Sequence, residues 1–464
     1  MAIRPRVGQV LQWRQACSCH PSRGHLAGAA ATGGALAITI GLTVFSGGGF
    51  SDASQSTFIA LSGVTLLLTA SFNGIATITA MRSPLALTLG ALGALCIASA
   101  AWTIGEPVTS VRWGLTITSY GAVFIAAATF TRVLGPWPLA AGIAVLAAIE
   151  AILGVRALAM HALPDAESIG GVWRPGGTFE YPPALAILEV GAIPILSYAM
   201  ARRSGLVAWA SAAATVLAGA VLGLAGSRLG VGLAVVFLAI MALTSRASGI
   251  SRVTVAGTAT LLIVGALASS ALLNGHLAPG ATSGDYTSPH VRNTSQARGA
   301  SEVQRTPPSR PRSDLLHGRA HEWDAALQTW LHRPLLGAGG GAYYEASLPH
   351  QGSAPTLYAH DLPLELAAEL GVLGLLMGVA LYVTCGWTIA TTSDCTALML
   401  LGATVVAFLA SNLIDWTWHL AGLGALWAVC AGGLAGCGRR MHQDRSWEID
   451  RGLVAPGAYD RVAG

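Results

Sequence analysis

Long apolar runs recur along almost the whole chain, and they constrain its fold more than any other feature. A run of about 20 apolar residues matches the thickness of the hydrocarbon core of a bilayer. Only 10% of the 464 residues are charged, whereas a soluble domain carries about 25%. We therefore expect an all-α, polytopic integral membrane protein. Its twelve predicted transmembrane helices lie near residues 27–47, 56–79, 85–104, 113–131, 136–155, 183–201, 205–225, 229–244, 253–273, 361–385, 396–414 and 418–437. Two of them, 113–131 and 229–244, are weak or short.

The arginines predict how these helices are oriented, because cytoplasmic loops of membrane proteins are enriched in basic residues. All 26 basic residues are arginines, and the short turns "SGGGFSDASQ" and "GEPVTSVR" hold one between them. If the N-terminus is cytoplasmic, most of the arginines that lie before and after the large outer loop fall in segments on the cytoplasmic side. These cytoplasmic arginines are Arg4, Arg6, Arg14, Arg23, Arg82, Arg132, Arg202, Arg203, Arg246, Arg252, Arg439, Arg440 and Arg445. We expect a multi-pass protein of the inner (cytoplasmic) membrane with both termini in the cytoplasm.

This topology divides the chain into five parts. They are a cytoplasmic segment over 1–26, transmembrane helices 1–9 over 27–273 with an outer loop at 156–182, a large extracytoplasmic loop over 274–360, transmembrane helices 10–12 over 361–437, and a cytoplasmic tail over 438–464. No internal repeat is visible.

The large outer loop changes character halfway along. Residues 280–313 contain almost no large apolar side chains, so we expect them to be disordered. An amphipathic helix follows, with Ser313 or Asp314 as its cap and Arg333-Pro334 at its end. We expect this helix to lie along the membrane surface or over a cavity. Its apolar stripe consists of Ala320, Trp323, Leu327, Trp330 and Leu331.

The stretch "LYAHDLPLELAAELGVLGLL" places ionisable groups at the start of the tenth span. Such groups are costly in hydrocarbon unless they are paired or face water. Asp361 can cap the helix, while Glu365 and Glu369 share a face with it and either order the bundle through an ion pair or contact substrate. His360 is the candidate catalytic residue, because a histidine near neutrality can accept a proton from a hydroxyl group.

Three arginines lie on the predicted outer side, against the positive-inside bias. Arg228 lies between two spans, Arg319 on the amphipathic helix, and Arg174 in the first outer loop. Guanidinium groups suit phosphate oxygens, so Arg228 and Arg319 are candidate diphosphate-binding residues. Arg228 has an alternative role as a partner of Glu365 or Glu369, and Arg174 an alternative role in ordering its loop.

Metal and nucleic-acid chemistry find little support in the sequence. Seven of the twelve histidines fall in the large outer loop, but their spacing is scattered. Cys17, Cys19 and His20 have no second pair of ligands at zinc spacing. We expect no metal and no other cofactor, and a net charge of only +4 gives no reason to expect a nucleic-acid partner.

Polar residues also occur between the last two predicted spans, in "SNLIDWTWHLAGLG". Asp415 and His419 lie there beside Trp416 and Trp418. Tryptophan is enriched at membrane interfaces, so interfacial anchoring is the expected role of this segment.

Several of these stretches together resemble the bacterial O-antigen ligase and polymerase superfamily. "RAHEWDAALQTWLHRPLLGAGGGAYYEA", followed by "AHDLPLELAAELGVLGLL", is similar to the carboxy-terminal signature of that superfamily. "GSRLGVGLA" and "RPGGTFEYPPALA" resemble two further motifs. The resemblance covers roughly residues 170–437 and also fits the twelve spans with a large loop before the histidine.

The resemblance implies a metal-independent, inverting membrane glycosyltransferase with a C-type fold. Such an enzyme moves a glycan from a polyprenyl diphosphate, such as undecaprenyl diphosphate, to an acceptor hydroxyl of a lipid, wall polymer or glycan. Arg228 and Arg319 would bind the diphosphate, and His360 would lie at the acceptor. Glu369 corresponds to the acidic residue of the family's "E-G--G" element. Asp361 replaces the Asn or Ser that is usual after the histidine.

Two alternatives remain open at this point. The first is a polysaccharide repeat-unit polymerase of the same superfamily, which differs from a ligase only in its acceptor. The second is a transporter with the internal carboxylates as a proton relay. Transporters often contain repeats and helices broken near mid-membrane, whereas the ionisable groups here gather at one face, which favours the enzyme.

Overall fold

The computed structural model describes residues 23–169, 172–245, 250–273, 319–352 and 355–450. Ten of its helices are long and apolar enough to cross a membrane, and two shorter apolar helices, α9 and α15, accompany them in this part of the chain. The helices are α2 (Arg23–Val44), α3 (Asp52–Met81), α4 (Pro84–Ala98), α5 (Pro107–Leu134), α6 (Trp137–Met160), α7 (Pro182–Arg202), α8 (Leu206–Ala225), α9 (Arg228–Leu243), α11 (Arg252–Leu273), α12 (Arg319–His332), α13 (Tyr343–Ser347), α14 (Leu362–Ala390), α15 (Cys395–Ser411) and α16 (Ala421–Asp450).

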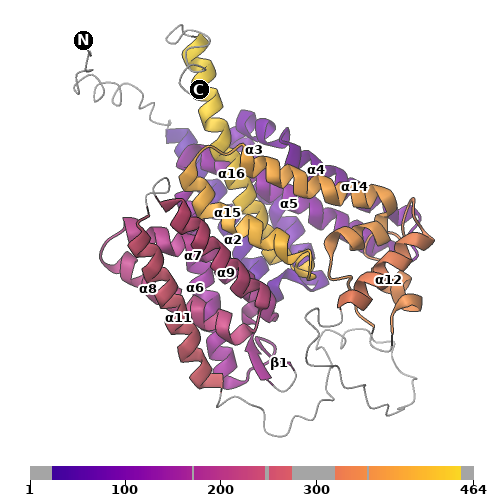
Figure 1. Ribbon diagram of the computed structural model, residues 1–464. Helices are drawn as coiled ribbons and strands as arrows, with labels where there is room; N and C mark the ends of the chain where they lie inside the picture. The colour runs from indigo at the N-terminus through magenta and orange to yellow at the C-terminus, as the bar shows by residue number, and fades with distance from the viewer. Residues whose placement is uncertain (1–22, 170–171, 246–249, 274–318, 353–354, 451–464) are drawn as a thin grey trace, which may run out of the picture.

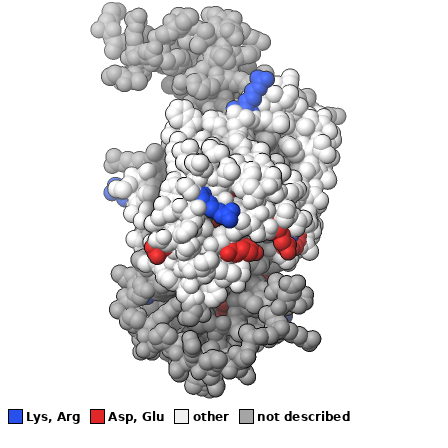
Figure 2. Space-filling model, turned by 90° about the vertical axis from the view of Figure 1, so that its right-hand side faces the viewer, with Lys and Arg blue, Asp and Glu red and all other residues white. Residues whose placement is uncertain are grey.

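The predicted all-α, polytopic membrane fold is confirmed. α15 and α16 run through the middle of the bundle, with α6, α8, α9 and α11 on one side and α3, α4 and α14 on the other (Figure 1). α5 packs against α16, α4 and α3. Figure 2 shows one face of the molecule with few charged side chains, as expected of a surface that meets lipid.

The weak apolar signal at residues 113–131 belongs to α5, a long helix that lies inside the bundle. Its buried polar side chains include Thr116 and Thr129, whose hydroxyls donate to carbonyls one turn earlier in the same helix. A helix surrounded by protein has less need of apolar side chains than one that faces lipid, so hydropathy understates it. The span near 396–414 is shorter than expected, because α15 ends at Ser411.

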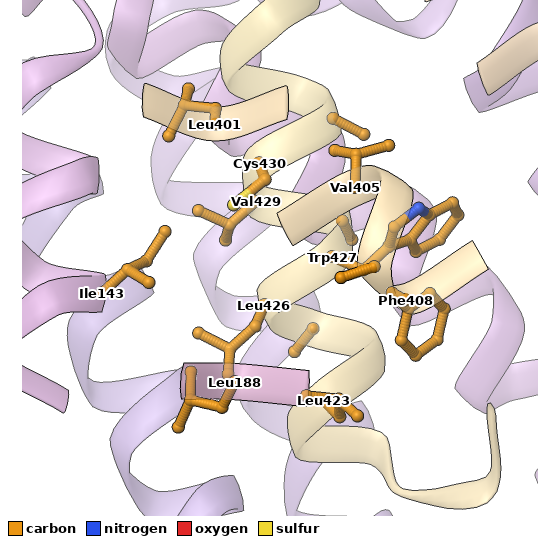
Figure 3. Packing of buried hydrophobic residues seen from close by; sticks show 14 of the residues in the cluster. Ile143, Leu188, Leu401, Val405, Phe408, Leu423, Leu426, Trp427, Val429 and Cys430 are labelled. Carbon is orange, nitrogen blue, oxygen red and sulfur yellow. The ribbon is translucent and has the colours of Figure 1, made fainter. Parts of the chain in front are cut away.

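Small residues let the central helices approach closely. A side chain on Gly432 of α16 would overlap the carbonyl of Phe124 in α5, and one on Gly436 would overlap the carbonyl of Ala128. Around them, Trp427 and Phe408 stack at 5.4 Å between ring centroids. Figure 3 shows this core, which α15 and α16 build with Ile143 of α6 and Leu188 of α7. Such backbone contact is typical of helices packed within a membrane.

The two ends of the bundle differ. One end carries α12 and a two-stranded antiparallel hairpin, β1 (Ala166–Ile169) with β2 (Val172–Pro175), and we call it the α12 end (Figure 1). The hairpin lies within the predicted loop 156–182, where no strand was expected. α16 ends at the opposite end of the bundle. It continues to Asp450, beyond the predicted limit of its span. The predicted disordered segment 280–313 lies outside the described residues.

α14 is broken near its start. Gly371 has φ +67° and ψ −153°, a conformation open to glycine only, whereas the sequence predicted an unbroken helix. The preceding loop fits into the break. Its amides of Ala338 and Gly339 donate to the carbonyls of Ala368 and Glu369 at 3.0 and 2.7 Å, and the amide of Val372 donates to the carbonyl of Pro334 at 2.8 Å. The loop thus pairs backbone groups that the break would leave unsatisfied.

Candidate active site at the α12 end

α12 presents small residues to the protein and larger apolar residues to its surroundings. The helix buries its small residues Ala325, Ala326 and Thr329, while Leu327 and Leu331 are exposed. Three members of the predicted apolar stripe, Ala320, Leu327 and Leu331, are thus exposed, where lipid or a ligand can cover them, whereas Trp323 and Trp330 are half-buried. Both candidate caps, Ser313 and Asp314, lie outside the part of the chain that the structure describes.

His360 occupies the turn that leads into α14. Its backbone has φ +55°, in the left-handed region that favours glycine. Its Nδ1 atom lies 3.1 Å from the Oε2 atom of Glu322 and 3.1 Å from the carbonyl oxygen of Tyr358. The indole Nε1 of Trp323 donates to the His360 carbonyl at 3.4 Å. The hydrogen bond to the Tyr358 carbonyl requires a donor, so we place the proton of the neutral imidazole on Nδ1, which leaves the lone pair of Nε2 for a reactant. The contact with Glu322 is one of charge, because its Oε2 atom makes no hydrogen bond among the described residues.

Asp361 is the N-cap of α14. Its Oδ1 accepts a hydrogen bond from the amide of Leu364 at 2.9 Å, as its sequence position predicts. Burial raises the pKa of Asp361, the hydrogen bond from Leu364 opposes that rise, and the charge of Glu365 adds to it.

Arg319 pairs with an acidic residue from the far end of the chain. Its guanidinium lies 3.6 Å from Oδ2 of Asp415, while Oδ1 of Asp415 accepts a hydrogen bond from the hydroxyl of Tyr181 at 2.7 Å. Burial, and then the negative charge of Asp415, raise the pKa of Tyr181, so its hydroxyl stays protonated as a donor. A quarter of the Arg319 side chain remains exposed, which leaves donor capacity for a ligand.

Arg174 and Arg228 lie near each other beside the hairpin. Arg174 is opposite Glu167 across the hairpin and donates to the carbonyl of Ala225 at 3.4 Å. A side chain on Gly226 would overlap its guanidinium. Arg228 follows two residues later as the first residue of α9, exposed and with no ion-pair partner among the described residues.

The two glutamates of α14 do not bind an arginine within the described chain, so that alternative for Arg228 is not observed. Glu365 bonds through Oε1 to the Nε2 atom of His419, and its Oε2 accepts from the amide of Ala359 at 3.0 Å. Glu369 accepts from the amide of Tyr343 at 3.2 Å. Both side chains are buried. They hold the amides of Ala359 and Tyr343 and the ring of His419 in place, so their role is to order the structure around the site.

Interfacial anchoring is the wrong interpretation of Asp415 and His419. The two residues are only 6% and 4% exposed. Beside them, Trp416 contacts three half-buried rings, those of Phe50, Tyr181 and Tyr358, at 5.5, 4.6 and 5.4 Å between centroids. Residues 415–419 therefore pack beneath the turn of His360, where Trp416 and His419 stack on Tyr358, and we call this segment the floor of the site.

The sequence did not single out Glu322, Tyr181 or Tyr358, and it left Arg112 without a role. Glu322 follows Arg319 by three residues, which places both on one face of a helix and could have suggested it. Arg112 is the arginine of the short outer turns, and it pairs with Asp52 at 2.7 Å. No local pattern indicates Tyr181 or Tyr358, because they meet the site only through the tertiary fold. Within the described residues, no group of three or more histidine, cysteine, aspartate or glutamate residues is arranged to hold a metal ion.

At the α12 end, Tyr181 bonds to Asp415 and Asp415 pairs with Arg319, which lies one helical turn from Glu322, the neighbour of His360. Arg174 bonds separately to Ala225, three residues before Arg228. Residues 213–379 match the family model described as O-antigen ligase. The resemblance to the O-antigen ligase and polymerase superfamily is thereby confirmed. The matched region contains Arg228, Arg319 and His360, whereas Arg174 precedes it. No curated protein matches the chain. The O-antigen ligase match supports a ligase- or polymerase-like enzyme of membrane glycan synthesis.

Proposed function

We propose that this protein transfers a glycan from a polyprenyl diphosphate carrier to an acceptor hydroxyl at the extracytoplasmic face of the cell membrane. The observation that carries the proposal is the setting of His360. Its Nδ1 is hydrogen-bonded to the Tyr358 carbonyl and lies 3.1 Å from the Glu322 carboxylate, and its Nε2 has no hydrogen-bond partner among the described residues. A histidine held in this way is suited to take the proton of an incoming hydroxyl group.

The arginines supply the second half of the chemistry. Arg319 lies one helical turn from Glu322, the partner of His360, and Arg228 is exposed beside the hairpin. In the proposed reaction, both guanidinium groups bind the diphosphate and stabilise the negative charge that develops as it leaves. A single displacement inverts the anomeric centre, and the arginines make a metal unnecessary. In this proposal the donor binds at the α12 end of the bundle. We place that end outside the cell and both termini in the cytoplasm.

The test uses purified protein in vesicles that contain a polyprenyl-diphosphate-linked glycan and an acceptor. The His360→Ala variant should lose glycan transfer by at least about 100-fold, in line with the contribution of a general base. His161→Ala is a matched control, because His161 also has a left-handed backbone, with φ +50°, and ends α6 beside the hairpin. Wild-type transfer by the His360→Ala variant would remove the proposal.

The same vesicles test the two alternatives. A polymerase would give a ladder of products with increasing numbers of repeat units, whereas a ligase would make a single transfer to each acceptor. A transporter would move the donor across the bilayer without forming a new glycosidic bond, and His360→Ala would then change movement and not transfer.

A further inference from the structure

A buried acid–histidine pair lies beneath the turn of His360. Glu365 and His419 are each 4% exposed, and Oε1 of Glu365 bonds to Nε2 of His419. The imidazole of His419 is stacked on the ring of Tyr358 at 3.8 Å and meets the edge of Trp113 at 4.3 Å between centroids. These ring contacts fix the orientation of His419, and through it the position of the Glu365 carboxylate.

The other oxygen of Glu365 reaches the turn itself. Oε2 accepts the amide hydrogen of Ala359 at 3.0 Å, directly before the left-handed residue His360. On the far side of His360, the amide of Leu362 donates to the carbonyl of Asn412 at 2.8 Å. The turn is therefore held on both sides of the histidine, by Glu365 in the first turn of α14 and by Asn412 at the end of α15.

This arrangement has a physical reason. A histidine adopts a left-handed backbone at a cost, so the surrounding structure must hold it there. A buried carboxylate is stable only where both oxygens have partners. The amide of Ala359 and the ring of His419 provide one partner each, so the pair can hold the turn without contacting a substrate.

We propose that the His419–Glu365 pair is a positioning element that sets the direction of the His360 imidazole. This inference rests on the proposed function of His360. The pair acts through the backbone of Ala359 and not through its charge at the reacting atoms. The length of the side chain at position 365 should therefore affect glycan transfer more than its charge does.

Two conservative variants separate geometry from charge. Glu365→Gln keeps the length of the side chain and can still accept from Ala359 and bond to His419. Glu365→Asp keeps the charge but is one methylene too short to hold both partners. We expect Glu365→Gln to retain transfer within about threefold, and Glu365→Asp to lower kcat by about 10- to 100-fold with unchanged KM for donor and acceptor. Glu189→Gln and Glu189→Asp, at a buried glutamate of α7, should both behave as wild type.

His419 gives an independent arm. Gln at this position can donate to Glu365 in place of Nε2, so His419→Gln should retain more kcat than His419→Leu, which leaves Oε1 of Glu365 buried without a partner. The reverse order at Glu365, with Asp active and Gln inactive, would overturn the proposal and assign the carboxylate a role through its charge. Equal losses in the Glu189 pair would overturn it as well, because the effect would then be a general one of altered buried acids.

A second measurement does not depend on transfer. Diethyl pyrocarbonate modifies accessible imidazoles, and mass spectrometry gives the rate at His360. We expect an altered rate in Glu365→Asp and a wild-type rate in Glu365→Gln. Equal rates in both would overturn the positioning proposal, even if His360→Ala is inactive and the proposed function stands. If wild-type protein and His360→Ala transfer glycan equally, the proposed function fails, whatever the modification rates are.

Discussion

The Nδ1 atom of His360 lies 3.1 Å from the Oε2 atom of Glu322, and the two residues come from elements 38 positions apart in the chain. A carboxylate beside Nδ1 favours the tautomer that leaves Nε2 unprotonated, and it stabilises the imidazolium that forms when a proton arrives. Glu322 therefore gives His360 a charge partner, while the hydrogen bond that orients Nδ1 goes to the carbonyl of Tyr358.

The Glu322→Gln variant tests this pairing. It should lower kcat for glycan transfer by up to about 100-fold, because the imidazolium loses its charge partner. Asp324→Asn, on the exposed side of the same helix, is the matched control. Wild-type kcat in Glu322→Gln, measured at saturating donor and acceptor, would show that the contact is not used in the reaction.

Substitution of Arg228 should affect the donor in particular. Arg228→Lys keeps the charge but loses the planar fork that binds two phosphate oxygens. We expect the KM for the polyprenyl-diphosphate donor to rise roughly tenfold, in line with the loss of about one charge-assisted hydrogen bond. The KM for the acceptor should not change, and the same substitution at Arg82, at the opposite end of the bundle, serves as a control. Unchanged donor kinetics would exclude Arg228 from the diphosphate site.

The cap of α14 should show a pH-dependent effect on stability. Because the pKa of Asp361 is raised in the fold, its ionised form is disfavoured there, and wild-type stability falls as the pH rises above the ordinary value for aspartate. Asp361→Asn keeps a good N-cap and removes that penalty. Its melting temperature relative to wild type should increase between pH 4 and pH 7. Asp361→Ala loses the cap and about 1 kcal/mol. A constant difference in melting temperature between Asp361→Asn and wild type across this pH range would contradict a raised pKa of Asp361.

The break in α14 should tolerate no side chain. Alanine at Gly371 has to adopt a positive φ at a cost of about 1–2 kcal/mol, and its Cβ would overlap the carbonyl of Leu335. Gly371→Ala should therefore destabilise the protein clearly in a thermal melt and displace the loop before α13. Gly386, in the same helix with open space around it, provides the control. Equal melting temperatures for the two variants would mean that the break is not required.

Transfer should also be insensitive to chelators, because the proposed scheme uses the arginines to neutralise the diphosphate. Incubation with excess EDTA should therefore leave the rate unchanged. Complete inhibition that a divalent cation restores would contradict a metal-independent reaction.

The sequence predicted those features that depend on local pattern. Apolar length indicated the helices, and Asp361 three residues before Leu364 indicated the cap, because both follow from the chemistry of neighbouring residues. It could not predict that Gly371 breaks α14. "LGVLGLL" is uniformly apolar, and the groups that fill the break come from the loop around Ala338.

The floor of the site was misjudged for a related reason. His419 follows two tryptophans, and this local composition is typical of a membrane interface. Its partner Glu365 is 54 positions away, and no periodicity links the two. The aromatic contacts that bury the pair come from Trp113 and Tyr358, in separate parts of the chain.

The glycine loop before α13 has a consequence for biosynthesis. Gly340 donates its amide to Ser99 at 2.8 Å, and its carbonyl accepts from Ser110 at 2.7 Å. Those serines leave the ribosome more than two hundred residues before the loop does, and the loop in turn closes the gap in α14. The contacts of Ser99 and Ser110 with the loop can therefore form only after the segment around Gly340 has been synthesised. Catalytic competence should be gained only when the last quarter of the polypeptide has been made.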